Sequence, residues 1–251
     1  MDYKCFGQIY VNGIIGSEAN GIYAISYKLP TLLTIVSSVF MQAWQFSAVT
    51  ESEGDSKEHS EFFGKVWGSF QAVMFLAGGF VIAFAKPAMK LLTTKEFYSA
   101  WEYIPLLSAS MVFTAFASFM GTVYVVKKKS NLSFITAFIG ASINVLLNFI
   151  LIPSALGVQG AAIATVTSYL VVFVVRALNS QKYIPFKLYG WHIAANTVII
   201  FLMSVVMITA MPYWVIIEVI ALILMAVINY KFLMICVEKM LSPIYNRIKR
   251  R

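Results

Sequence analysis

The sequence is poor in charged residues and nearly free of cysteine. Asp, Glu, Lys and Arg make up 12% of its 251 residues, about half of the share that is usual for a soluble domain. Its two cysteines, Cys5 and Cys236, lie near opposite ends of the chain and provide neither the ligand spacing of a metal site nor a disulfide framework. A Gly-rich phosphate loop and paired acidic motifs are also missing. The sequence therefore predicts no enzyme, no catalytic residues, no metal site and no cofactor.

Apolar residues, by contrast, are abundant and gather in long runs. They make up 60% of the chain, and the mean hydropathy is +0.79. A helix needs about 20 apolar residues to cross the hydrocarbon core of a bilayer, and it satisfies its own backbone hydrogen bonds there. The pattern predicts an all-α, polytopic transmembrane helical bundle. The expected membrane helices are 21–49, 62–85, 104–126, 131–152, 158–175, 191–210 and 213–235.

Two segments outside these helices have a different character. Residues 3–16 are too short and too interrupted to cross a bilayer comfortably, so we expect the tail end of a helix there, followed by a turn at 17–20. Charged residues are interspersed with large apolar ones over 86–103, which predicts an amphipathic helix on the outer membrane surface.

The Lys and Arg residues are distributed unevenly between the two sides of the predicted bundle. Alternate loops and the tail on one side collect thirteen of them, whereas the opposite side carries Lys86, Lys90 and Lys95. Positive residues are retained on the cytoplasmic side, so the C-terminus is predicted to be cytoplasmic. The net charge of +8 follows from this placement and favours membrane lipids over nucleic acid as partners. The thirteen are Lys57, Lys127, Lys128, Lys129, Arg176, Lys182, Lys187, Lys231, Lys239, Arg247, Lys249, Arg250 and Arg251.

A polar stripe runs along the predicted helix 21–49. At about 100° per residue, six polar side chains fall within an arc of roughly 120°. Such a stripe has to face protein or water rather than acyl chains. For its Ser and Thr hydroxyls, interhelical hydrogen bonds that hold the bundle together are the simpler interpretation. The six residues are Lys28, Thr31, Thr34, Ser38, Gln42 and Gln45.

Lys28 is the one cation of this stripe and lies eight residues into the predicted helix, on the order of 12 Å below its outer end at 1.5 Å per residue. Its charge is costly there unless the side chain snorkels to the headgroups or meets an anion, and both interpretations stay open. Pro30 cannot donate a backbone hydrogen bond, so we expect a hinge or break beside Lys28. Broken helices are where transporters bind their substrates.

A second polar stripe occupies helix 131–152. Asn144 and Asn148 lie one turn apart on the face that also carries Ser133 and Thr136. Asparagine is a poor residue to expose to lipid, so this face is predicted to point inward.

Two tryptophans and two glycines give weaker signals. Trp67 is expected in the interfacial aromatic belt, and Trp44 belongs either to that belt or to a surface that stacks on a sugar. Gly64 and Gly68 have the four-residue spacing that allows helices to pack closely.

Several of these segments resemble the polysaccharide flippases of the multidrug, oligosaccharidyl-lipid and polysaccharide exporter superfamily, which transport O-antigen and capsule repeat units. The resemblance covers the chain as the C-terminal half of a family member, so we expect a partial chain that forms one lobe of a two-lobed, alternating-access transporter. The resembling residues are 21–24, 28–30, 43–45, 144–148, 152–153, 157 and 160–165. The expected parts are the lobe at 1–178, two additional membrane helices at 179–235 and a basic cytoplasmic tail at 236–251.

The resemblance also implies a function, a site and a location. A family member translocates an undecaprenyl-diphosphate-linked oligosaccharide across the bacterial cytoplasmic membrane for surface polysaccharide biosynthesis. Carried over by position, Lys28 would meet the diphosphate, while Gln42, Gln45, Asn144 and Asn148 would line the cavity and bind sugar hydroxyls. The implied partners are this lipid-linked substrate, membrane lipids, and an N-terminal lobe or polysaccharide assembly proteins.

Two other functions stay open. A multidrug or toxin exporter of the same superfamily would need a buried carboxylate to exchange a cationic cargo against protons or sodium, whereas Glu218 is the one acid expected deep within a membrane helix. A non-transporting membrane scaffold is the third interpretation. Lys28 and the scarcity of acids in the membrane helices favour an anionic, lipid-linked cargo over a cationic drug, while the scaffold stays open.

Overall fold

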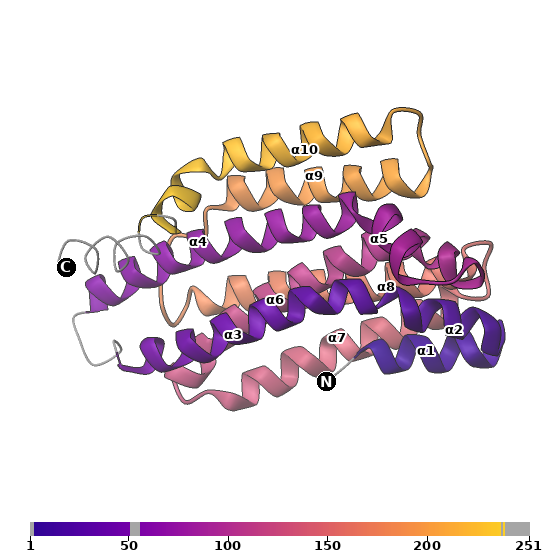
Figure 1. Ribbon diagram of the computed structural model, residues 1–251. Helices are drawn as coiled ribbons and strands as arrows, with labels where there is room; N and C mark the ends of the chain where they lie inside the picture. Colours follow the sequence, from indigo (N-terminus) through magenta and orange to yellow (C-terminus); the bar gives the residue numbers. More distant parts are fainter. Residues whose placement is uncertain (1–2, 51–55, 237, 239–251) are drawn as a thin grey trace, which may run out of the picture.

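Helices make up nearly all of the computed structural model, which describes residues 3–50, 56–236 and 238 (Figure 1). No strand occurs within these ranges, so the predicted all-α bundle is confirmed. The helices are α1 (Tyr3–Ile14), α2 (Ser17–Ser26), α3 (Lys28–Thr50), α4 (Ser56–Ala83), α5 (Ala85–Leu92), the 3₁₀-helix η2 (Lys95–Glu102), α6 (Ile104–Val126), α7 (Ser130–Leu151), α8 (Gly157–Ser180), α9 (Gly190–Ile208) and α10 (Trp214–Ile228).

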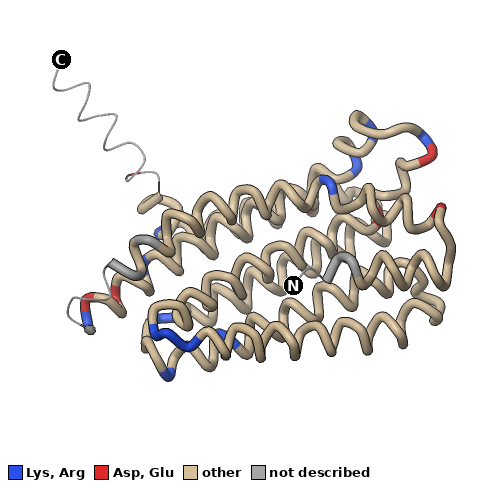
Figure 2. The backbone as a smooth tube through the Cα atoms, turned by 90° about the horizontal axis from the view of Figure 1, so that it is seen from below, with Lys and Arg blue, Asp and Glu red and all other residues tan. Residues whose placement is uncertain are grey.

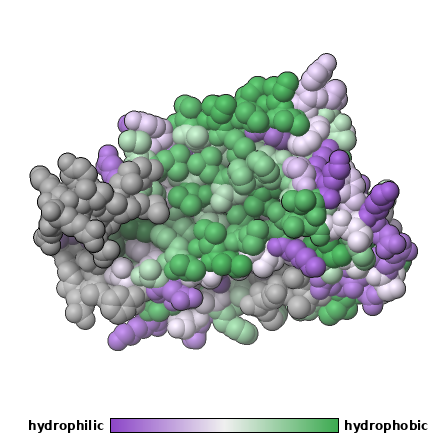
Figure 3. Space-filling view, viewed as in Figure 1, coloured by the Kyte–Doolittle hydropathy of each residue, from purple (hydrophilic) through white to green (hydrophobic). Residues whose placement is uncertain are grey.

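Six helical segments of the described chain are long and apolar enough to cross a membrane. A seventh candidate is α10 together with the short helix Tyr230–Cys236, which bends away from it by 74°. Charged residues gather near the two ends of the bundle (Figure 2), and a broad apolar band lies between the ends (Figure 3). These are the features of a multi-pass membrane protein. The six segments are Ser17–Gln45, Lys57–Ala83, Ile104–Val126, Ser130–Leu151, Gly157–Ser180 and Gly190–Ile208.

Helix α6 is the centre of the bundle. It packs against α3, α4, α8 and α9, and most of its side chains are buried. Helix α7 lies against α8, while α9 and α10 pack together and against α4. Figure 1 shows these helices running side by side, with α1, α2 and α5 at the end of the bundle opposite the start of α4.

Aromatic rings build the core between α3, α4 and α6. The Trp44 ring stacks on Phe119 with the centroids 4.9 Å apart, and the Trp67 ring lies 5.1 Å from the same phenylalanine. The Trp44 indole N–H donates to Thr122 Oγ1 at 3.1 Å, and that of Trp67 donates to the Leu188 carbonyl at 2.9 Å. Both indoles are buried. The belt prediction for Trp67 is therefore wrong, and Trp44 neither stacks on a sugar nor faces the interface, because packing between helices takes up both rings.

Three local predictions are also wrong. Residues 17–20 are helical, because Gly16 forms the turn before them with a φ of 125° that favours glycine. Segment 86–103 forms two short helices, α5 and η2, instead of one. The predicted helix 213–235 is broken at Asn229, after which the chain bends.

The predicted division of the chain falls near a helix end. The boundary expected between residues 178 and 179 lies in the last turn of α8, and α9 and α10 follow it. Of the predicted basic tail, residues 237 and 239–251 lie outside the described part of the chain.

Candidate functional site

The polar stripe of α3 lies on the exposed side of that helix. All six of its side chains are exposed, from Lys28 at the first turn to Gln45 near the other end. The opposite side of α3 is buried against α4 and α6 through Leu33, Met41 and Trp44. This packing fixes the rotation of α3 and turns the stripe away from the core.

The polar groups of the stripe make few contacts with other helices. The Thr31 hydroxyl donates to the Tyr27 carbonyl at 2.6 Å, and the Ser38 hydroxyl donates to the Ile35 carbonyl at 2.9 Å, so both are satisfied within their own chain segment. The Thr34 hydroxyl instead meets the Met111 sulfur of α6 at 3.4 Å. Hydroxyls that are bonded within their own chain segment do not connect two helices. This weakens the interpretation that the stripe holds the bundle together by interhelical hydrogen bonds.

Gln42 and Gln45 present free amides on the same face. Neither side chain has a hydrogen-bond partner among the described residues. A primary amide offers two donors and an acceptor, which suits sugar hydroxyls or water. Two such amides on an exposed face of a membrane helix require a polar neighbour, because acyl chains cannot satisfy them.

Lys28 lines a pocket at the end of the bundle where α2 meets α3. The pocket has a volume of about 460 Å³, and Thr93 and Thr94 from the α5–η2 connection and Phe97 of η2 line its other side. The helix is interrupted at Tyr27, directly before Lys28, although α2 and α3 together count as one span. Pro30 follows within the first turn of α3, and its role as a hinge stays a prediction.

Asn144 and Asn148 occupy a different environment. Both are fully buried, and the Asn148 amide donates to Asn144 Oδ1 at 2.9 Å. The outward face of α7 is apolar, with Phe134 and Phe138 exposed. The second stripe points inward as predicted, but the structure does not bring its two asparagines to the exposed face that carries Gln42.

Arg176 is a polar residue of the bundle that sequence reasoning missed. It lies inside α8 rather than in a loop, and its guanidinium donates to Thr136 Oγ1 at 2.9 Å, the Ala117 carbonyl at 2.8 Å and the Ser133 carbonyl at 3.1 Å. One side chain thus joins α6, α7 and α8. Because guanidinium carries five donors in a fixed plane, it can serve several acceptors at once.

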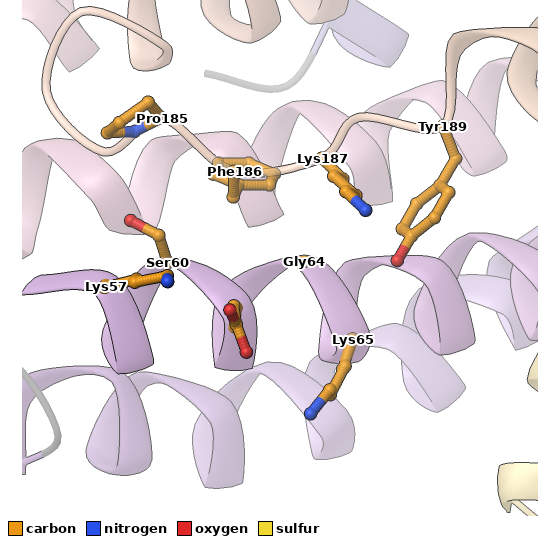
Figure 4. A pocket seen from close by; sticks show the side chains of 9 residues that line it. Lys57, Ser60, Gly64, Lys65, Pro185, Phe186, Lys187 and Tyr189 are labelled. Carbon is orange, nitrogen blue, oxygen red and sulfur yellow. The ribbon is translucent and has the colours of Figure 1, made fainter.

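A basic pocket lies at the opposite end of the bundle from Lys28. It has a volume of about 420 Å³ between the start of α4 and residues 185–189, and its lining includes Lys57, Lys65 and Lys187 together with one acid, Glu61. Figure 4 shows the Lys187 and Tyr189 side chains directed from this linker toward α4. Ammonium groups around a pocket of this kind suit a phosphate or another anion.

Gly64 and Gly68 of α4 face two different segments. A Cβ atom at Gly64 would lie 3.4 Å from the Lys187 backbone nitrogen, and one at Gly68 would clash with the Phe232 ring. Gly68 therefore has the close-packing role predicted for the pair, whereas Gly64 borders a non-helical linker. The neighbours of Gly64 and Gly68 are the linker and the segment after α10, respectively.

Comparisons of the chain with protein-family models, with curated proteins and with solved structures find no match. Within the described residues, no group of three or more His, Cys, Asp or Glu side chains could hold a metal ion. The assignment of a function therefore depends on the α3 face and on the two cationic pockets.

Proposed function

We propose that the chain translocates an undecaprenyl-diphosphate-linked oligosaccharide as one lobe of an alternating-access transporter. The observation that carries this proposal is the exposed polar face of α3, from Lys28 to Gln45, in a chain whose helices are otherwise suited to lipid. A membrane helix presents such a face to a second lobe or to a solvated path, because lipid leaves its amides unsatisfied. The polar face thus supports a translocation path between two lobes.

The chemistry of this face favours an anionic, glycosylated cargo. Within residues 28–50 the stripe carries a cation and two amides, and no Asp or Glu occurs there. A cationic drug would need a carboxylate along its path, whereas a lipid diphosphate needs positive charge and its sugars need hydrogen-bonding groups. Lys28 supplies the charge, and Gln42 and Gln45 supply the hydrogen bonds.

The basic pocket and Lys28 are cationic sites at the two ends of the bundle. The lysine-lined pocket on α4 lies at the end with most of the basic residues, and Lys28 lies at the other. In the proposed orientation the basic end and the C-terminus are cytoplasmic, in the bacterial cytoplasmic membrane. A diphosphate headgroup would then be held first at the basic pocket and finally near Lys28.

Replacement of Lys28 by Ala in cells that produce the protein tests the proposal. We expect surface polysaccharide to fall at least about tenfold, because a charge-assisted contact to the diphosphate is lost, while the lipid-linked oligosaccharide accumulates on the cytoplasmic leaflet. Lys95→Ala is the matched control, since Lys95 is an exposed lysine at the same end. The amount of protein in the membrane is measured for each variant.

Two different outcomes would contradict the proposed role of Lys28 and the proposed function of the chain. Normal export in the Lys28→Ala variant would remove Lys28 from the path. Normal export after deletion of the whole chain would contradict translocation itself and favour a scaffold.

A further inference from the structure

Glu218 is a buried acid without a partner. It lies in α10, where most neighbouring side chains are apolar and exposed, yet it is itself 1% exposed. Neither carboxylate oxygen has a hydrogen-bond partner among the described residues. Buried polar groups are almost always satisfied, and an unpaired acid within a membrane helix is costly. An unpartnered group of this kind indicates that something else binds there.

Glu218 borders a pocket that also contains two lysines. The pocket has a volume of about 590 Å³ and lies between α10 and the junction of α4 with α5, with Lys86 and Lys90 among its lining residues. The Lys86 ammonium lies 4.2 Å from the centroid of the Trp101 ring and 4.7 Å from that of Trp214. The two indoles therefore hold this cation by cation–π contacts.

The charges of the pocket influence one another without forming a contact pair. Burial lowers the pKa of Lys86, and the carboxylates of Glu218 and Glu102 oppose that shift. No ion pair joins Lys86 to Glu218 in the described structure. The pocket thus combines an unpartnered acid with an ammonium whose charge it influences, which is the complement of a zwitterion.

The remaining lining is apolar and faces outward. Phe84, Val215 and Val219 are each about half exposed, at 48%, 51% and 50%, and they lie beside the charged groups. Glu218 lies four residues into α10, about 6 Å along its axis. The pocket therefore combines a charged recess with an apolar outer wall.

We propose that this pocket binds a glycerophospholipid with a primary amine in its headgroup, as in phosphatidylethanolamine. The lipid ammonium donates hydrogen bonds to the Glu218 carboxylate, its phosphate meets Lys86 and Lys90, and an acyl chain lies along Val215 and Val219. The site is separate from the polar face of α3 and does not depend on the proposed cargo.

The charged groups of the pocket favour phosphatidylethanolamine over other phospholipids and over a metal ion. The choline headgroup of phosphatidylcholine has the same phosphate but no N–H to donate to Glu218. Phosphatidylglycerol has no cation for the carboxylate. A metal ion would find a single carboxylate, because no three-residue ligand group exists in the described chain.

Native mass spectrometry of the purified full chain in detergent tests the proposal. Dioleoyl-phosphatidylethanolamine, dioleoyl-phosphatidylcholine and dioleoyl-phosphatidylglycerol are added in turn, and the retained lipid is counted. We expect phosphatidylethanolamine to be retained at least about tenfold more than phosphatidylcholine. Only its ammonium has N–H groups that can donate to the Glu218 carboxylate. Soluble phosphoethanolamine, which has the headgroup without acyl chains, is expected to bind far more weakly.

Variants locate the effect within the pocket. Glu218→Gln should remove the preference for the amine, and Lys86→Gln should lower retention of phosphatidylethanolamine and phosphatidylcholine alike. Glu96→Gln, the same change at an exposed acid of η2, should behave as wild type. Equal retention of the two lipids by the wild-type protein overturns the proposal, as does an unchanged preference in Glu218→Gln. Tight binding of soluble phosphoethanolamine would contradict a lipid as the occupant.

Discussion

Three acceptors from two helices converge on the Arg176 guanidinium, namely Thr136 Oγ1 and the carbonyls of Ala117 and Ser133. A charged side chain within a membrane helix is tolerated when its donors are occupied by protein groups. Gly121 leaves space for this arrangement, because a Cβ there would lie 3.0 Å from an Arg176 nitrogen. At the scale of single residues, Arg176 is therefore a structural cross-link rather than a part of the translocation path.

Replacement of Arg176 by Met should destabilise the bundle by about 2–4 kcal/mol, because the acceptors it serves lose charged donors. The apparent Tm of the detergent-solubilised protein measures this effect. Lys182→Met, at an exposed cation just beyond α8, is the control and should leave the Tm near that of wild type. Equal Tm values for the two variants would show that the Arg176 contacts add no stability.

At the scale of elements, the contact between the end of α7 and the start of α8 depends on one glycine. A Cβ at Gly160 would lie 2.7 Å from the Leu151 carbonyl oxygen and 2.8 Å from its carbonyl carbon. These are backbone atoms, so neither can move aside as a flexible side chain would. The small-residue block 160–165 thus lets two antiparallel helices pack closely after a short turn.

Gly160→Ala should therefore cost about 1–3 kcal/mol through overpacking. Gly190→Ala is the matched control, because nothing lies within 4 Å of its Cβ position and its φ is not in the left-handed region. Thermal unfolding of both variants in the same detergent gives the comparison. A Gly160→Ala protein as stable as Gly190→Ala would mean that the two helices separate without cost.

The membrane helices could be predicted from the sequence because apolar runs of spanning length set both their type and their approximate ends. The break at Asn229 could not. Its side-chain amide donates to Asn196 Oδ1 at 3.0 Å and accepts from the Asn196 amide at 3.2 Å, and a third bond donates to the Met225 carbonyl at 2.8 Å. Asn196 lies 33 residues away from Asn229, in α9. No local sequence pattern can therefore predict the bend.

The candidate site could also be predicted only in part: the residues that share a helix face could be predicted, but the way the faces are arranged in the bundle could not. The spacing of Lys28, Gln42 and Gln45 was enough to predict that they share one face of α3, and the structure turns that face outward. The spacing of Asn144 and Asn148 likewise predicted a common face of α7. Whether two such faces meet depends on how α3 and α7 are rotated by their neighbours, and that rotation is set by tertiary packing such as the stacking of Trp44 in the core. Burial of the asparagine pair follows from that packing.

At the scale of the whole molecule, exposed surfaces of two kinds occur at membrane depth. The exposed side of α3 carries hydroxyls and amides beside the apolar side chains of Leu32, Ile35, Val36 and Val39, whereas that of α7 carries aromatic residues such as Phe134 and Phe138. The unpartnered amides of Gln42 and Gln45 are costly against acyl chains, whereas exposed phenylalanines are suited to them. The central claim is that the α3 face borders water or a second lobe, while the α7 face borders lipid.

Cysteine labelling in intact membranes tests this claim most directly. In a protein with Cys5 and Cys236 replaced by Ser, single cysteines are introduced at Ser38 on α3 and at Phe138 on α7, both exposed and about 12–15 Å from the start of their helices. We predict that a water-soluble maleimide labels Ser38→Cys and leaves Phe138→Cys unmodified. Protection of Ser38→Cys to the same degree as Phe138→Cys would contradict a solvated path along α3.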